Sequence, residues 1–93
     1  MGLKDRIQNC SVCQRIPPHM IDAIDRYVER RIPPGSFTTA LLSNDLMAAA
    51  NKGDDINRRL LWEYCFLLYN HLPCGCYGSP EAVSAWLRGE ANG

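Results

Sequence analysis

The side chains whose spacing most directly suggests chemistry are cysteines, of which this short chain has five. Cys10 and Cys13 form a Cys-x-x-Cys pair, and Cys74 and Cys76 form a tighter Cys-x-Cys pair near the other end. Thiolates are preferred zinc ligands, and the first spacing is typical of half a tetrahedral site. The sequence therefore predicts a structural zinc held by Cys10, Cys13, Cys74 and Cys76.

The sequence leaves three alternatives to this arrangement open. His19 or His71 can replace one thiolate, because imidazole nitrogen is also a zinc ligand. The second spacing is shorter than the usual two-residue gap, so the thiols could instead be reduced and metal-free. His71 could also act only as a favourable charge at a helix C-terminus.

A second candidate site lies between two expected helices, in the segment that runs from Arg30 to Thr39. Free N–H groups at a helix N-terminus attract anions, and nearby hydroxyl groups and arginines add hydrogen bonds to phosphate oxygens. We expect a phosphate-binding corner made by Arg30, Arg31, Gly35, Ser36, Phe37, Thr38 and Thr39. The alternative is that Ser36 only caps its helix while the threonines face water.

Other side chains could recognise the remainder of a nucleotide. Asparagine amides can contact base edges or ribose, and aromatic rings such as Phe37 or Tyr69 can stack on a base. The candidates for these contacts are Asn44, Asn51, Asn57, Tyr69 and Asn70.

Composition excludes several functions. Lys plus Arg and Asp plus Glu each number 10, which argues against the basic surface that binds DNA or RNA polymers. No apolar run is long enough to span a bilayer, and the first residues resemble neither a secretion nor a lipidation signal, so we expect a cytoplasmic protein. The two histidines lie in no known catalytic spacing, so we expect no enzyme.

The periodicity of apolar residues predicts an all-α fold in a single domain, residues 1–93. Four main helices are expected at about 18–31, 36–51, 55–71 and 79–88, packed as a compact bundle behind an irregular N-terminal arm, residues 1–16. The residues around Cys65 have the strongest helical pattern, in which Cys65 and Ile56 are core positions and Glu63 is outside. The apolar stripe of the second helix is wide, which predicts a homo-oligomer.

Several segments resemble a family of small proteins encoded by tailed bacteriophages and prophages. The resemblance covers about residues 16–88 and rests on Ile32-Pro33-Pro34-Gly35-Ser36-Phe37, Leu42-Ser43-Asn44-Asp45-Leu46, Tyr69-Asn70 and Cys74-Gly75-Cys76-Tyr77-Gly78-Ser79-Pro80-Glu81 ending at Trp86. The Cys10–Cys13 arm lies outside it. The resemblance implies a phage protein, located in the host cytosol, and names no chemistry of its own.

Two functional hypotheses follow. By analogy with small phage proteins that counter host defence, the first is an anti-defence protein that sequesters a phosphate-bearing signal, such as a cyclic oligonucleotide or an ADP-ribose derivative, without catalysis. The second is a helical protein-interaction adaptor for a host or phage protein, with or without a structural zinc. Its docking residues would be Met47, Trp62, Tyr64 and Trp86, because aromatic residues and Met are enriched at interfaces.

Overall fold

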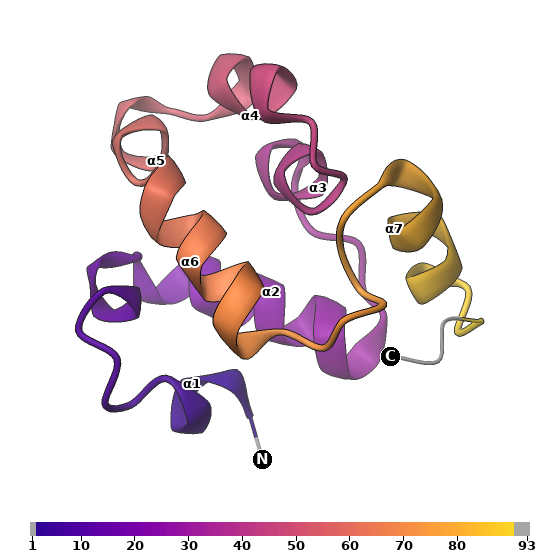
Figure 1. Ribbon diagram of the computed structural model, residues 1–93, viewed down its shortest axis with the longest axis horizontal. Coiled ribbons are helices and arrows are strands. Elements are labelled where there is room, and N and C mark those ends of the chain that lie inside the picture. The colour runs from indigo at the N-terminus through magenta and orange to yellow at the C-terminus, as the bar shows by residue number, and fades with distance from the viewer. Residues whose placement is uncertain (1, 91–93) are drawn as a thin grey trace.

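The computed structural model describes residues 2–90, and all the regular secondary structure in that part of the chain is helical. The elements are α1 (Leu3–Arg6), the 3-10 helix η1 (Cys13–Arg15), α2 (Pro18–Arg30), α3 (Ser36–Leu42), α4 (Leu46–Lys52), α5 (Asp55–Arg59), α6 (Leu61–His71) and α7 (Pro80–Leu87). The molecule is a flattened body of 32 × 31 × 18 Å, in which α6 crosses in front of α2 (Figure 1). The all-α prediction is confirmed.

Two of the four expected helices match the structure. α2 and α7 lie within a residue of their predicted bounds, and the predicted N-cap Ser79 accepts a hydrogen bond from the Ala82 N–H (3.0 Å). Pro80 then occupies the first turn of α7, where its missing N–H costs nothing. These two ends were predictable because proline and a capping hydroxyl act locally.

The other two expected helices are each broken in two, so a bundle of four continuous helices is wrong. The segment 36–51 breaks at Asn44, which has a left-handed φ of 62°, and the Asp45 carboxylate then caps α4 at the Ala48 N–H. Asparagine tolerates this conformation better than most residues. The segment 55–71 breaks at Leu60, and a 2.6 Å hydrogen bond from the Tyr64 hydroxyl to Asn57 connects α5 to α6.

The N-terminal arm is more ordered than predicted. It contains α1 and η1, and it buries Leu3, Ile7, Cys13 and Ile16 in the core. It also packs on the charged side of α2. The Leu3 N–H donates to Asp25 (2.9 Å), and Lys4 pairs with Asp22 (2.8 Å). Charges that look like a solvated helix surface in the sequence therefore hold the arm in place.

The core is built around two fully buried tyrosines, Tyr27 on α2 and Tyr64 on α6. The Tyr27 hydroxyl donates to the Cys76 carbonyl (2.7 Å), and the indole N–H of Trp86 donates to the Tyr27 carbonyl (3.1 Å). These hydrogen bonds connect α2, the loop before α7 and α7 itself, and they satisfy polar groups that would be costly to bury alone.

Three expectations about α5 and α6 are wrong. Cys65 and Ile56 are exposed, whereas Glu63 is buried and pairs with Arg15 of η1 (3.2 Å). The break at Leu60 changes the helical phase, so Ile56 is not on the side of α6 that packs in the core. Glu63, Leu67 and His71 lie on one side of α6, at intervals of four residues, and η1 packs against this helix.

Candidate functional site

Arg31, one of the two arginines expected to bind phosphate, makes a different contact in the structure. Arg31 ends α2 in the left-handed conformation, with φ of 60°. Its guanidinium donates to the Trp86 carbonyl (3.2 Å) and lies 3.8 Å from the centre of the Trp86 ring. This arginine therefore connects the end of α2 to the end of α7.

The remaining residues of the expected corner do not converge on one open site. Gly35, not Ser36, is the N-cap of α3, and the Ser36 side chain is exposed. Phe37 packs edge-on against Tyr64, with the ring centres 5.2 Å apart, and Thr38 is only 1% exposed. The prediction that the Thr38 hydroxyl faces a ligand is therefore wrong, because that side chain lies inside the core.

A cavity of about 330 Å³ does lie beside the start of α3. Its polar lining includes Ser36, Thr39, Ser43, Lys52 and the Asp45 carboxylate. The Thr39 hydroxyl donates back to the Pro34 carbonyl (3.3 Å). The lining includes one lysine and one carboxylate, so it has no net positive charge to attract an anion.

Asn44 and Tyr69 do come together, but in a different cavity from Ser36. This cavity has a volume of about 290 Å³ and lies between α3, α6 and the loop before α7. Its other lining residues are Leu41, Cys65, Leu68, Tyr77 and Gly78. Asn70 is not among its lining residues, and its amide donates to the Phe66 carbonyl within α6 (3.0 Å). The residues predicted to form one nucleotide site therefore lie around two separate cavities.

A potential metal-binding group is present, with a different ligand set from the predicted one. Ligand atoms of Cys10, Cys13 and His71 all lie within 4.8 Å of one another. The two sulfur atoms are 2.8 Å apart, and the Cys13 N–H donates to the Cys10 sulfur (3.3 Å). The arm supplies both thiols, and the last residue of α6 supplies the imidazole. His71 thus takes the place that the sequence left open for a histidine.

The two cysteines of the second predicted pair differ in burial. Cys76 is fully buried, its carbonyl accepts the Tyr27 hydroxyl, and burial raises the pKa of its thiol to about 12. Cys74 is exposed, and neither belongs to the group with His71. Burial also raises the pKa of Cys13 to about 12, with a smaller contribution from Cys10. Without a metal, Cys13 is therefore a neutral thiol and a poor nucleophile.

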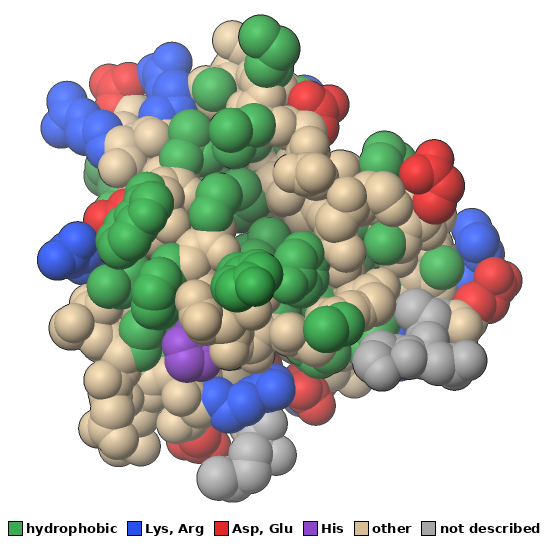
Figure 2. Space-filling view, viewed as in Figure 1, with side chains coloured by type: hydrophobic (Ala, Val, Ile, Leu, Met, Phe, Trp, Pro, Cys, Tyr) green, Lys and Arg blue, Asp and Glu red, His purple; other side chains and the backbone are tan. Residues whose placement is uncertain are grey.

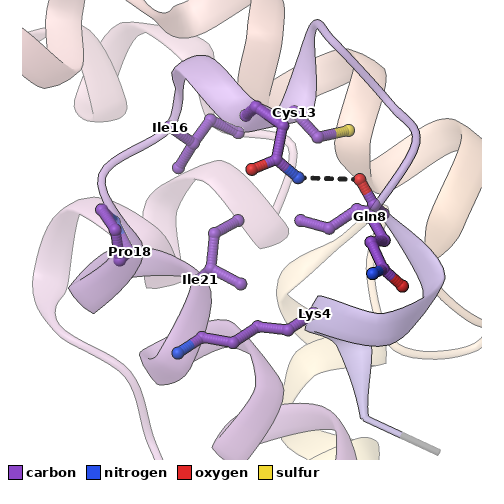
Figure 3. A pocket seen from close by; sticks show the side chains of 8 residues that line it. Lys4, Gln8, Cys13, Ile16, Pro18 and Ile21 are labelled. Carbon is purple, nitrogen blue, oxygen red and sulfur yellow. Dashed lines mark hydrogen bonds between the residues drawn. The ribbon is translucent and has the colours of Figure 1, made fainter.

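A third cavity was not predicted from the sequence. It has a volume of about 340 Å³ and lies between α1, η1 and the start of α2, with Ile7, Ile16 and Ile21 among its lining residues. The Gln14 amide donates to the Ile7 carbonyl (2.9 Å). Figure 3 shows the Cys13 sulfur pointing away from Ile16 and Ile21. The Lys4 amine at its edge is already paired with Asp22.

Both sides of α6 are apolar: the inward side packs in the core, and the outward side is exposed. The outer stripe consists of Trp62, Cys65, Phe66 and Tyr69, at the spacing of one helix side. Trp62 is 61% exposed and Tyr69 is 80% exposed. Figure 2 shows hydrophobic side chains gathered over α6 and continuing toward α4, with charged side chains mainly around their edge. Tyr64 and Trp86, which were also expected to be exposed, are buried.

Comparisons with protein-family models, curated proteins and solved structures give no match to this chain. None of the helices in residues 2–90 has the length and apolar character needed to cross a bilayer.

Proposed function

We propose that this protein is a non-catalytic protein-interaction module whose contact surface is the outer stripe of α6. The observation that carries the proposal is the exposure of Trp62 and Tyr69 (61% and 80%) on a helix whose opposite side is buried. A helix that is apolar all round is typically covered all round in the functional assembly. Large aromatic side chains are also the residues that contribute most at protein interfaces.

In this proposal, a second copy of the chain packs against the stripe, and the two copies form a homo-oligomer. Trp62, Cys65, Phe66 and Tyr69 include no charged side chain. Two copies related by a two-fold axis can pack these stripes together without burying an unpaired charge. Exposed Leu46 and Met47 of α4 and Ile56 of α5 then remain available for a different protein. The resemblance to small phage proteins implies that this partner is a host or phage protein.

A zinc ion is the second part of the proposal. Cys10, Cys13 and His71 have the donor atoms that zinc prefers, and their ligand atoms lie within 4.8 Å of one another. An ion there would connect the arm to the end of α6. A domain of this size buries a limited apolar area, so such a metal would add stability that the core alone does not supply.

The double variant Trp62→Ser/Tyr69→Ser tests the proposed interface. Sedimentation equilibrium at micromolar concentration is expected to give an oligomer for the wild type and a monomer for the variant. Met47→Ser is the matched control, since it also removes an exposed apolar side chain (83% exposed) but lies on α4. Its mass should equal that of the wild type. A monomeric wild type, or an unchanged mass for the double variant, would contradict the proposal.

Sequestration of a phosphate-bearing nucleotide has weaker support. Arg31 contacts Trp86, Thr38 is buried, and Tyr69 lines a different cavity from Ser36. A tight phosphate site needs charged donors that are already in position. Thermal shift with cyclic oligonucleotides and ADP-ribose derivatives separates the two functions, because a ligand that binds the native state must raise its stability.

A further inference from the structure

The group of Cys10, Cys13 and His71 supplies three ligands, whereas structural zinc sites are almost always four-coordinate. We propose that Cys74 is the fourth ligand, so that the ion fixes the loop after α6 as well as the N-terminal arm. This inference rests on the proposed zinc site. It keeps Cys74 from the predicted second cysteine pair and replaces Cys76 with His71.

The position of Cys74 in the chain places it within reach of His71. His71 ends α6, and Cys74 follows three residues later, so their Cα atoms are at most about 11 Å apart. The Cys76 N–H donates to the Pro73 carbonyl (3.3 Å), so Cys74 lies inside a turn that directs the chain back toward the core. The Cys74 side chain is exposed and can rotate without breaking a packed contact.

The other two cysteines are unsuitable as the fourth ligand. Cys76 is fully buried behind the Tyr27 hydrogen bond, and moving its thiol would disrupt the core. Cys65 lines the cavity with Tyr69, on the outer stripe of α6, and it does not share the side of the helix that carries Glu63, Leu67 and His71. Cys74 is the remaining thiol among the described residues.

Zinc binding requires the distance between the Cys10 and Cys13 sulfurs to increase. Two thiolates bound to one zinc, each at about 2.3 Å from it, are roughly 3.8 Å apart. The Cys10 and Cys13 sulfurs are 2.8 Å apart, so they must separate when the ion enters between them. Binding releases the thiol protons and involves no oxidation. The competing fate of such a close pair is a disulfide, which the experiment below detects.

The test compares Cys74→Ser with Cys65→Ser, a matched loss of an exposed thiol. Reduced wild-type protein is expected to bind about one equivalent of zinc, as a four-ligand site requires. Cys74→Ser should bind zinc at least about 100-fold more weakly. Losing an outer-shell partner already weakens metal binding by up to about 100-fold, and losing a direct ligand should cost no less. Cys65→Ser should match the wild type in zinc affinity alone, because Cys65 belongs to the outer stripe of α6 and not to the proposed ligand set. Circular dichroism verifies that both variants retain their helices.

Cobalt gives a readout that a structural effect would not reproduce. The thiolate-to-cobalt charge-transfer band should lose about one third of its intensity in Cys74→Ser, because three thiolates become two. Zinc should slow amide hydrogen exchange in the loop 72–78 of the wild type but not of Cys74→Ser.

The negative outcomes are distinct. If Cys74→Ser binds zinc and cobalt as Cys65→Ser does, Cys74 is not a ligand and the inference fails, whereas the three-ligand site stands. If reduced wild-type protein binds no zinc, or Cys10 and Cys13 are recovered as a disulfide after purification under reducing conditions, the zinc site itself fails.

Discussion

At the scale of single residues, the adjacent arginines Arg30 and Arg31 have opposite surroundings. Arg31 stacks on Trp86 and hydrogen-bonds to its carbonyl, whereas the Arg30 side chain is exposed. Arg31→Ala should therefore lower the free energy of unfolding by about 1–3 kcal/mol, the range for losing a stacked cation and a charged hydrogen bond. Arg30→Ala should change it by less than about 0.5 kcal/mol. Urea unfolding measures both values.

The same pair also tests the nucleotide hypothesis. If Arg31 served a phosphate ligand and not the fold, Arg31→Ala would leave stability near that of Arg30→Ala and abolish any thermal shift caused by ADP-ribose derivatives. Equal stability of the two variants would contradict the structural role. Arg31→Gly removes the same contacts but tolerates the φ of 60°, so it should be about 1 kcal/mol more stable than Arg31→Ala.

At the scale of helices, Gly53 determines how closely the end of α4 approaches α3. A Cβ at this position would lie 2.9 Å from two ring atoms of Phe37 and 3.3 Å from the Ala49 carbonyl. The Phe37 ring is itself packed against Tyr64, so it has little room to move. Gly53→Ala should lower the free energy of unfolding by about 1–3 kcal/mol, as overpacking usually does.

Gly35→Ala is the matched control for this contact. A Cβ at Gly35 meets nothing within 4 Å, and its φ of −65° suits any residue. Its effect should stay below about 1 kcal/mol, because only the N-cap preference and the entropy of the unfolded chain change. Equal losses for the two alanine variants in thermal unfolding would show that backbone freedom, not the contact with Phe37, explains the effect at Gly53.

The helices that the sequence predicts well are those whose ends depend on local chemistry. Pro18, Ser79 and Pro80 determine the starts of α2 and α7 without help from the rest of the fold. The breaks at Asn44 and Leu60 are less evident, because the apolar spacing continues through both. Burial of Glu63 depends on Arg15, which is far away in the chain, so no local pattern could indicate it.

The candidate sites were likewise predictable only where they depend on local sequence. The Cys10–Cys13 spacing is local and could be identified, and His71 was among the possible replacements. The choice of His71 over Cys76 depends on the arm packing against α6, a tertiary contact. The phosphate corner was not found for a related reason. Arg31 contacts Trp86 of α7 and Thr38 is buried in the core, and the local sequence indicates neither of these tertiary contacts.

At the scale of the whole molecule, three buried acidic groups outside the proposed zinc-ligand set make the fold sensitive to alkali. Burial raises the pKa of the Cys76 thiol from 9.0 to about 12. Burial likewise raises the pKa values of the Tyr27 and Tyr64 hydroxyls above their ordinary value of 10.0. Each group keeps its proton more tightly in the folded state than in the unfolded chain. Their effect on stability is therefore constant below pH 9, and deprotonation favours unfolding above it.

The free energy of unfolding should consequently fall as the pH rises from 9 to 12, by up to about 1.4 kcal/mol per pH unit from the thiol alone. The hydroxyls add to this slope above pH 10. Urea unfolding of Cys76→Ala, at the same metal content as the wild type, should give a shallower decline, since the variant has one titrating group fewer. Cys65→Ala removes an exposed thiol instead of a buried one, so it should retain the wild-type slope. If Cys76→Ala also retained it, the buried thiol would not be a source of the alkaline sensitivity.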